Sequence, residues 1–246
     1  MKNMLRNRLM QLYRDNPLPD NERQARINNE GEVATIYVYA PIGSWFGIDA
    51  EQFARDLQAL TATTINLHVN SPGGDVFDGR AMAAAIRNHP ANVVCHVDGL
   101  CASAATYLAT ASNKVVMEAG SFYMIHNAWT VTVGDKRDAM AAHDLLVQID
   151  QAIVDDYAKA TGKSAEEIAK WMDDETWFNP QAAVDAGFAT EVAGADKEDT
   201  KDASNLAASW NLSAYRNAPQ LRRSEPRAHN MAQMARRLEL RERLAS

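Results

Sequence analysis

A serine near the middle of this 246-residue chain stands in a context that favours nucleophilic catalysis. Ser103 lies within positions 99–105 (GLCASAA), after an apolar run. It begins a stretch of small residues that is typical of a helix start. A helix N-terminus supplies free N–H groups and partial positive charge, which stabilise a developing oxyanion. A capping serine is the commoner explanation of such a position. Cys101 is a rival nucleophile, although cysteine more often packs as a buried apolar residue.

A histidine could supply the general base that a serine nucleophile requires. His126 follows the apolar run 122–125 and precedes a loop, which places its ring at a predicted strand end. Imidazole has an ordinary pKa near neutrality, which suits proton transfer from a hydroxyl. The other five histidines have simpler structural explanations, because they lie within strands, on a helix, before a proline or in the tail.

Two further signals accompany this pair. Positions 70–75 (NSPGGD) put two glycines after a predicted strand, where backbone N–H groups can face a carbonyl oxygen or a phosphate. Alone this glycine pair indicates a tight turn, since the sequence has no Walker lysine or G-x-G-x-x-G pattern there. Residues 173–175 (DDE) could fix the histidine tautomer, or could equally be a solvated helix end. The four signals together predict a hydrolase site.

The elements that must position these residues alternate between strand and helix. Strands are predicted at 34–40, 65–69, 93–97, 114–117, 122–125 and 188–192, and helices at 49–60, 75–86, 103–111, 135–160, 164–172 and 180–186. A turn is predicted at positions 98–99. This order indicates an α/β fold with a largely parallel sheet, in which loops at the carboxyl ends of strands collect the functional groups.

Composition divides the chain into three parts. Residues 1–29 are polar and Arg-rich and are expected to form an arm or a short helix outside the core, and residues 30–195 are expected to form the folded domain that carries the predicted site. Residues 196–246 are a polar tail, expected to be disordered or partly helical, with an apolar stripe at Met231, Met234 and Leu238. From position 215 onward the tail holds eight arginines and no lysine.

Charge and cysteine content exclude several classes of function. The net charge of -7 argues against nucleic-acid binding, which needs basic surface to neutralise phosphates. No apolar run reaches the length of a membrane span or of a signal-peptide core. Two cysteines are too few for a disulfide framework and fit a reducing compartment, so a cytoplasmic protein is expected.

Three motifs resemble, in order and spacing, those of the ClpP family of serine peptidases. They are residues 70–74 (NSPGG), 99–103 (GLCAS) and 124–126 (MIH), within a similarity that runs from about residue 32 to residue 192. The resemblance implies the crotonase-like fold of stacked βαβ units and ring-shaped homo-oligomers that enclose the active sites. It also implies serine-type endopeptidase activity on protein substrates without a metal or cofactor.

The resemblance also implies a role for individual residues. Ser103 is implied as the nucleophile, His126 as the base, and the amides of Gly74 and Ala104 as the oxyanion hole. Counting back from the helix stop at position 187 without a gap puts Glu175 at the family's acid position. A shift of one residue puts Asp174 there instead.

Departures from the family pattern point to a narrower group. Residues 104–105 (AA) replace the common Met-Gly, and residues 127–129 (NAW) replace the usual Gln-Pro. With residues 174–178 (DETWF) and the long polar tail, these features are similar to the ClpP-related head maturation (prohead) proteases of tailed bacteriophages. That similarity implies cleavage of capsid, scaffold or portal proteins in the infected host cytoplasm or inside the procapsid, and a tail that binds scaffold or is self-processed.

Two alternatives remain open at this point. One is a ClpP-like subunit that works with an ATPase in general protein turnover. The other is a non-proteolytic assembly shell with the same fold. A signal-peptide peptidase relative is disfavoured, because the sequence shows neither that class's catalytic lysine nor a membrane segment.

Overall fold

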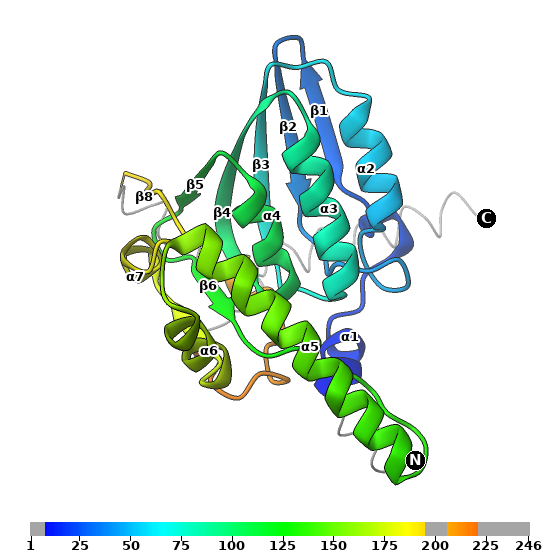
Figure 1. Ribbon diagram of the computed structural model, residues 1–246. Helices are drawn as coiled ribbons and strands as arrows, with labels where there is room; N and C mark the ends of the chain where they lie inside the picture. The colour runs from blue at the N-terminus through cyan, green and yellow to red at the C-terminus, as the bar shows by residue number, and fades with distance from the viewer. Residues whose placement is uncertain (1–7, 195–205, 221–246) are drawn as a thin grey trace, which may run out of the picture.

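Eight strands form one mixed sheet at the centre of the molecule (Figure 1). The computed structural model describes residues 8–194 and 206–220. The strands are β1 (Arg26–Glu30), β2 (Val33–Val38), β3 (Thr64–Ser71), β4 (Asn92–Ala102), β5 (Lys114–Met117), β6 (Phe122–Ile125), β7 (Thr176–Phe178) and β8 (Glu191–Val192). The order is β1-β2-β3-β4-β5-β8, with β6 beside β4 and β7 beside β6. Only β1 and β7 run antiparallel to their neighbours in this described sheet, which confirms the predicted ClpP-like α/β fold with a largely parallel sheet.

Seven α-helices accompany this sheet in the described residues. They are α1 (Arg8–Asp15), α2 (Ala50–Gln58), α3 (Val76–Asn88), α4 (Thr106–Ala111), α5 (Lys136–Thr161), α6 (Ala165–Asp173) and α7 (Pro180–Asp185). Asp49, Asp75 and Asp135 cap α2, α3 and α5, each accepting a backbone N–H of the first turn. Figure 1 shows α2, α3 and α4 side by side on one face of the sheet and α5 extending past its edge. Within the described residues, no helix is both long and apolar enough to cross a bilayer.

The main core lies between the sheet and these helices. Ile36, Ile65 and Leu67 alternate with more exposed neighbours along β2 and β3 and are almost completely buried. They pack in one cluster with the helical residues Phe53 and Met82, which come from the stripes of α2 and α3 that face the sheet. The sheet is therefore a well-packed support for the loops at its edge.

Two strands pair with successive parts of β4 along one of its edges. Its first half, Val94 to Val97, pairs with β5, and its last three residues, 100–102, pair with β6. The predicted turn at positions 98–99 is wrong, because β4 continues through it as one strand of 11 residues. Gly99 instead permits close packing, since a Cβ there would lie 2.7 Å from the backbone nitrogen of Ala207.

Both ends of the described chain pack near the end of β4 and form a second apolar cluster. Residues 206–220, here called the strap, contribute Ala207, Trp210 and Tyr215, and α1 contributes Leu12. These residues pack against Leu100, Ala102 and Met124 of β4 and β6. Sequence composition had assigned the strap to a polar tail and α1 to an arm outside the core. The apolar stripe predicted at 231–238 lies outside the described residues.

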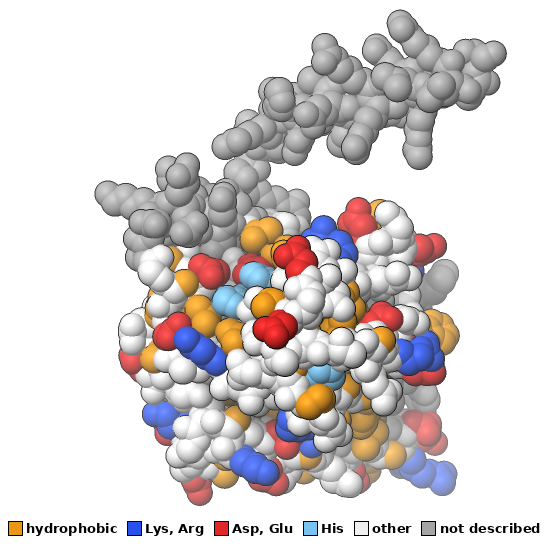
Figure 2. Space-filling view, turned by 90° about the horizontal axis from the view of Figure 1, so that it is seen from above, with side chains coloured by type: hydrophobic (Ala, Val, Ile, Leu, Met, Phe, Trp, Pro, Cys, Tyr) orange, Lys and Arg blue, Asp and Glu red, His pale blue; other side chains and the backbone are white. Residues whose placement is uncertain are grey.

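The outer surface carries mixed charge. Figure 2 shows acidic and basic side chains interspersed with uncharged ones over the face seen from above. Phosphate binding uses a surface dominated by basic side chains, and the visible part of this face has no such dominance.

Candidate active site

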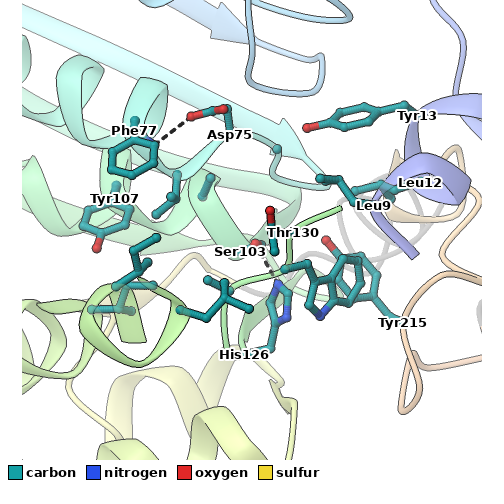
Figure 3. A pocket seen from close by; sticks show the side chains of 18 of the residues that line it. Leu9, Leu12, Tyr13, Asp75, Phe77, Ser103, Tyr107, His126, Thr130 and Tyr215 are labelled. Carbon is teal, nitrogen blue, oxygen red and sulfur yellow. Dashed lines mark hydrogen bonds between the residues drawn. The ribbon is translucent and has the colours of Figure 1, made fainter. Parts of the chain in front are cut away.

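Ser103 and His126 meet at the end of β4. The register of the parallel pair β4 and β6 places Ala102 beside Met124, so the two residues leave adjacent strand ends. The Nε2 atom of His126 lies 2.8 Å from the Oγ atom of Ser103, within hydrogen-bonding distance (Figure 3). Strand pairing rather than loop conformation therefore sets the spacing of this pair.

The backbone of Ser103 is strained. Its φ angle of 53° lies in the left-handed region, which non-glycine residues rarely adopt. The Thr106 hydroxyl donates to the Ser103 carbonyl at 2.6 Å, and the buried Tyr157 hydroxyl lies 2.6 Å from the same Thr106 oxygen. These contacts hold a sharp strand-to-helix turn that presents the serine side chain to His126.

The glycine pair lies directly against this turn. A Cβ on Gly73 would lie 2.7 Å from the Cβ of Ser103, so only glycine permits this approach. Ile42 accepts from the amide of Asp75 and donates to the carbonyl of Gly73, which directs the N–H of Gly74 away from Ile42. The amide of Gly74 is thus available to a ligand, as an oxyanion hole requires.

The second expected oxyanion donor is the amide of Ala104. Ala104 lies in the short 3₁₀ turn 103–105 that leads into α4, where the first N–H groups have no partner within the helix. A Cβ on Gly79 of α3 would lie 2.8 Å from the Ala104 carbonyl oxygen, so α3 packs closely against this turn. The turn and the glycine pair therefore offer two backbone donors beside the Ser103 side chain.

The environment of His126 keeps its imidazole neutral. Burial, reinforced by the positive charges of Arg8 and Arg216, lowers the pKa of His126 to about 3. The side chains of Trp129 and Tyr215 cover the ring, with centroids 4.5 Å and 5.4 Å away. A neutral imidazole can accept a proton from Ser103, although the low pKa makes it a weak base in this state.

The acidic loop places Glu175 near His126 and Asp174 away from it. In the antiparallel pair β6 and β7, Ile125 lies opposite Thr176, so the next residues outward are His126 and Glu175. Glu175 is only 3% exposed, whereas Asp174 is exposed and forms an ion pair with Lys170. The Glu175 carboxylate accepts from the amide of Asn217 at 2.7 Å, and the hydrogen bonds of the described residues include none between it and His126.

An apolar cavity opens beside the serine. It has a volume of about 270 Å³ and is lined on its inner side by Tyr107, Ile149, Ile153 and Tyr157. Figure 3 shows Tyr107 and Phe77 on one side of Ser103 and Tyr215 on the other. The lining fits an apolar group of a ligand that lies beside Ser103.

Cys101, the rival nucleophile, lies in the interior. It is fully buried in β4, and burial raises the pKa of its thiol well above the ordinary value. A thiol that stays protonated and inaccessible is a poor nucleophile. In the part of the chain that the structure describes, no group of three or more metal-ligating side chains gathers.

Sequence analysis missed the residues that reach the site from the two ends of the chain. Tyr215 and Arg216 come from the strap, and Arg8 comes from α1, with its guanidinium 5.9 Å from the Trp129 ring centroid. None of them lies in a periodic apolar pattern. One sequence feature is related to them. Trp129, which contacts Tyr215 and Arg8, belongs to the segment 127–129 where the sequence departs from the family pattern.

Known proteins resemble most of this chain. A family model described as Clp protease matches residues 36–196. The ATP-dependent Clp protease proteolytic subunit 1 of Corynebacterium jeikeium is 29% identical over 136 residues, covering 54% of this chain and 72% of the relative. The ATP-dependent Clp protease proteolytic subunit of Streptococcus pneumoniae is 28% identical over 166 residues, covering 66% and 81%. The structure of a point mutant of ClpP1 from Listeria monocytogenes superposes with a TM-score of 0.58 at 25% identity, covering 67% of this chain and 94% of that one.

Proposed function

The chain belongs to the Clp protease family of serine peptidases, and we propose that Ser103, His126 and Glu175 are its catalytic residues. The observation that carries this assignment is the 2.8 Å distance between the His126 Nε2 and Ser103 Oγ atoms beside two backbone amides. The enzyme is a serine-type endopeptidase. The residue roles proposed here follow the general division of labour between nucleophile, base and orienting acid.

The proposed reaction is acyl transfer through Ser103. His126 takes the Ser103 proton as the oxygen attacks the peptide carbonyl, and the amides of Gly74 and Ala104 hold the resulting oxyanion. The imidazolium then protonates the leaving amine as the peptide bond breaks. Water, deprotonated by His126, releases the acyl group from the serine. Glu175 stabilises the imidazolium and orients its ring when its carboxylate turns toward His126.

As substrates we propose capsid, scaffold or portal proteins that are cut a limited number of times during phage head maturation. Two features support this choice. Trp129 belongs to the segment that departs from the usual family pattern. Its ring centroid lies 5.0 Å from that of Tyr215, which belongs to the strap. A peptidase whose own chain packs over its proposed base, His126, suits an enzyme that acts only at one stage of assembly.

A second candidate is a subunit that depends on an ATPase for general protein turnover. The relatives from Corynebacterium jeikeium and Streptococcus pneumoniae are named as ATP-dependent proteolytic subunits, which favours this alternative. The two candidates differ in energy requirement. Limited cleavage of an assembly protein without ATP supports the first, and degradation of a folded substrate only with an ATPase and ATP supports the second.

We further propose that the chain works as a homo-oligomeric ring. Four large apolar side chains on α3 and α5 are more than half exposed, namely Phe77, Met140, Leu145 and Val147. Such exposed apolar side chains favour burial against another copy of the chain. Native mass spectrometry of the full chain gives the number of subunits, and a monomer at micromolar concentration would contradict a stable ring.

The peptidase assignment is tested by co-expression with candidate head proteins. Intact mass spectrometry should show discrete truncations of a capsid, scaffold or portal protein with the wild-type chain. Ser103→Ala should lower the cleavage rate by about 10⁶-fold, since an unassisted serine site retains only binding and oxyanion effects. Cys101→Ala is the matched control and should retain activity. Truncations that persist in Ser103→Ala would refute the role given to this serine.

A further inference from the structure

We propose that the strap is an autoinhibitory segment that closes over Ser103 and must be displaced before a substrate can bind. This inference rests on the peptidase function proposed above and concerns the regulation of the same site. It follows from three contacts that the strap makes with the catalytic groups, and from an anchor that it makes elsewhere.

The first contact puts a side chain over the nucleophile and its base. Tyr215 is 5% exposed, and its hydroxyl donates to the carbonyl oxygen of Pro72 at 2.6 Å. Burial raises the pKa of this phenol, with the neighbouring Ser103 side chain acting in the opposite direction, so Tyr215 remains a neutral donor. Figure 3 shows Tyr215 beside His126, on the side of Ser103 opposite Phe77 and Tyr107. A peptide carbonyl approaching Ser103 from this side meets the tyrosine first.

The second contact engages the candidate acid of the triad. The backbone N–H of Asn217 donates to the Glu175 Oε1 atom at 2.7 Å, and the Asn217 side-chain amide donates to the Asp174 carbonyl at 2.7 Å. Glu175 and His126 both lie next to the last residue pair of β6 and β7. The Glu175 carboxylate nevertheless bonds to the strap and not to His126. In the closed state His126 therefore lacks the partner that would stabilise its protonated form.

The third contact is electrostatic. Arg216 of the strap acts with Arg8 of α1 to disfavour a positive charge on His126, in addition to the effect of burial. Catalysis requires His126 to become positively charged as it takes the serine proton. Displacing the strap removes the Arg216 charge and lets water approach the ring, and both changes make His126 a stronger base.

The anchor of the strap lies at a separate place on the sheet. Asn70 donates to the Leu206 carbonyl at 3.3 Å and accepts from the Trp210 indole N–H at 3.2 Å, so one buried side chain holds the first part of the strap. Asn16 likewise exchanges two hydrogen bonds with the backbone of Asn211. These contacts are non-covalent, so displacing the strap requires no covalent bond of the domain to break.

The direct test compares Tyr215→Ala with Ser213→Ala in the full-length chain. Ser213 is an exposed strap residue that bonds to Gln11 and not to the catalytic groups, which makes it the matched control. The measurements are kcat/KM on a fluorogenic peptide with an apolar residue before the cleaved bond, and the rate of Ser103 labelling by a fluorophosphonate. If the open state holds a tenth of the molecules or fewer, Tyr215→Ala should raise both rates by about tenfold or more. Ser213→Ala should match the wild type.

A second variant and a peptide added in trans complete the test. Trp210→Ala loosens the strap at its anchor and should also raise both rates. A synthetic peptide of residues 206–220 should inhibit the Tyr215→Ala enzyme, and the same peptide with Ala at position 215 should inhibit it far less.

The outcomes separate the two proposals. Equal rates for the wild type, Tyr215→Ala and Trp210→Ala would overturn the strap as an inhibitor while leaving the peptidase in place. Absence of cleavage and labelling in every variant would overturn the peptidase assignment, and the inhibition with it.

Discussion

Glu175 and His126 are the residues next to the last pair of β6 and β7, Ile125 and Thr176. This position supports the proposal of Glu175 rather than Asp174 as the acid, because Asp174 is exposed and bound to Lys170. The carboxylate of Glu175 accepts from the strap at Asn217 in the closed state. A modest rotation of this side chain is what the proposed catalytic state requires.

The first prediction concerns this acid. Glu175→Gln should lower kcat by on the order of 10⁴-fold, because the neutral amide cannot stabilise the imidazolium that forms during attack. Asp174→Asn, on the neighbouring residue, should change kcat little. Steady-state kinetics of both variants in a Tyr215→Ala background measures the difference, and a larger loss with Asp174→Asn would transfer the role to Asp174.

The second prediction concerns the pH dependence of catalysis. The pKa of His126 is lowered in the folded protein, so the ring stays neutral and competent as a base until the pH falls through that low value. Arg8→Gln removes one of the positive charges that lower it. The acidic limb of the pH profile of kcat/KM should therefore move to higher pH, toward the ordinary histidine value.

Arg14→Gln is the control for this shift. Arg14 lies on the same helix but pairs with Asp15 and is not among the groups that lower the pKa of His126. The acidic limb of the pH profile of kcat/KM should be the same for Arg14→Gln as for the wild type. Coincident limbs for Arg8→Gln and the wild type would show that Arg8 does not act on the base.

The third prediction concerns the strained turn at Ser103. Thr106→Val removes the hydroxyl that bonds to the Ser103 carbonyl and leaves the buried Tyr157 hydroxyl without that partner. The free energy of unfolding should fall by about 1–3 kcal/mol, the cost of an unsatisfied buried polar group. Thr110→Val removes a similar bond, to the Tyr107 carbonyl, and should leave labelling of Ser103 unchanged. Urea unfolding measures the stability of both variants, and fluorophosphonate labelling measures the reactivity of Ser103, which Thr106→Val should change. Unchanged labelling in Thr106→Val would mean that other contacts hold the turn.

The fourth prediction uses the close approach of the strap to β4. A Cβ on Gly99 would lie 2.7 Å from both the Ala207 nitrogen and the Leu206 Cβ, so Gly99→Ala should push the start of the strap away. Overpacking of this kind costs about 1–3 kcal/mol. Limited proteolysis should then cut within residues 206–220 faster than in the wild type. Gly194→Ala, at a position with no atom within 4 Å, is the control, and equal cutting of all three proteins would contradict the tight packing seen here.

The sequence predicted the sheet and singled out Ser103 and His126, which the structure brings together, because both inferences depend on local patterns. Alternating apolar residues mark β2 and β3, and Ser103 and His126 follow apolar runs at strand ends. The strap could not be found in this way. Its buried residues, such as Trp210 and Tyr215, are separated by polar ones without a helical or strand period, so only contacts with distant residues order them.

Gly99 shows why one local rule failed. Asp-Gly is a common turn signal, and it predicted a break before the Ser103 helix. The glycine instead lies inside β4, where its missing side chain makes room for the strap. Gly99 is needed for a close contact with position 207, which is distant in sequence. Its sequence neighbours therefore do not distinguish it from a glycine in a turn.

The hydrogen bond from Tyr215 to Pro72 also sets an order of events, because it joins residues 143 positions apart. A ribosome releases the chain from its N-terminus, so both strands that carry Ser103 and His126 leave the exit tunnel before the strap does. The nucleophile and its base can pair while the strap is still being translated. Each newly made molecule therefore passes through an interval in which the strap does not yet pack against Ser103 and His126, and the rate of translation from β6 to the strap sets the length of that interval.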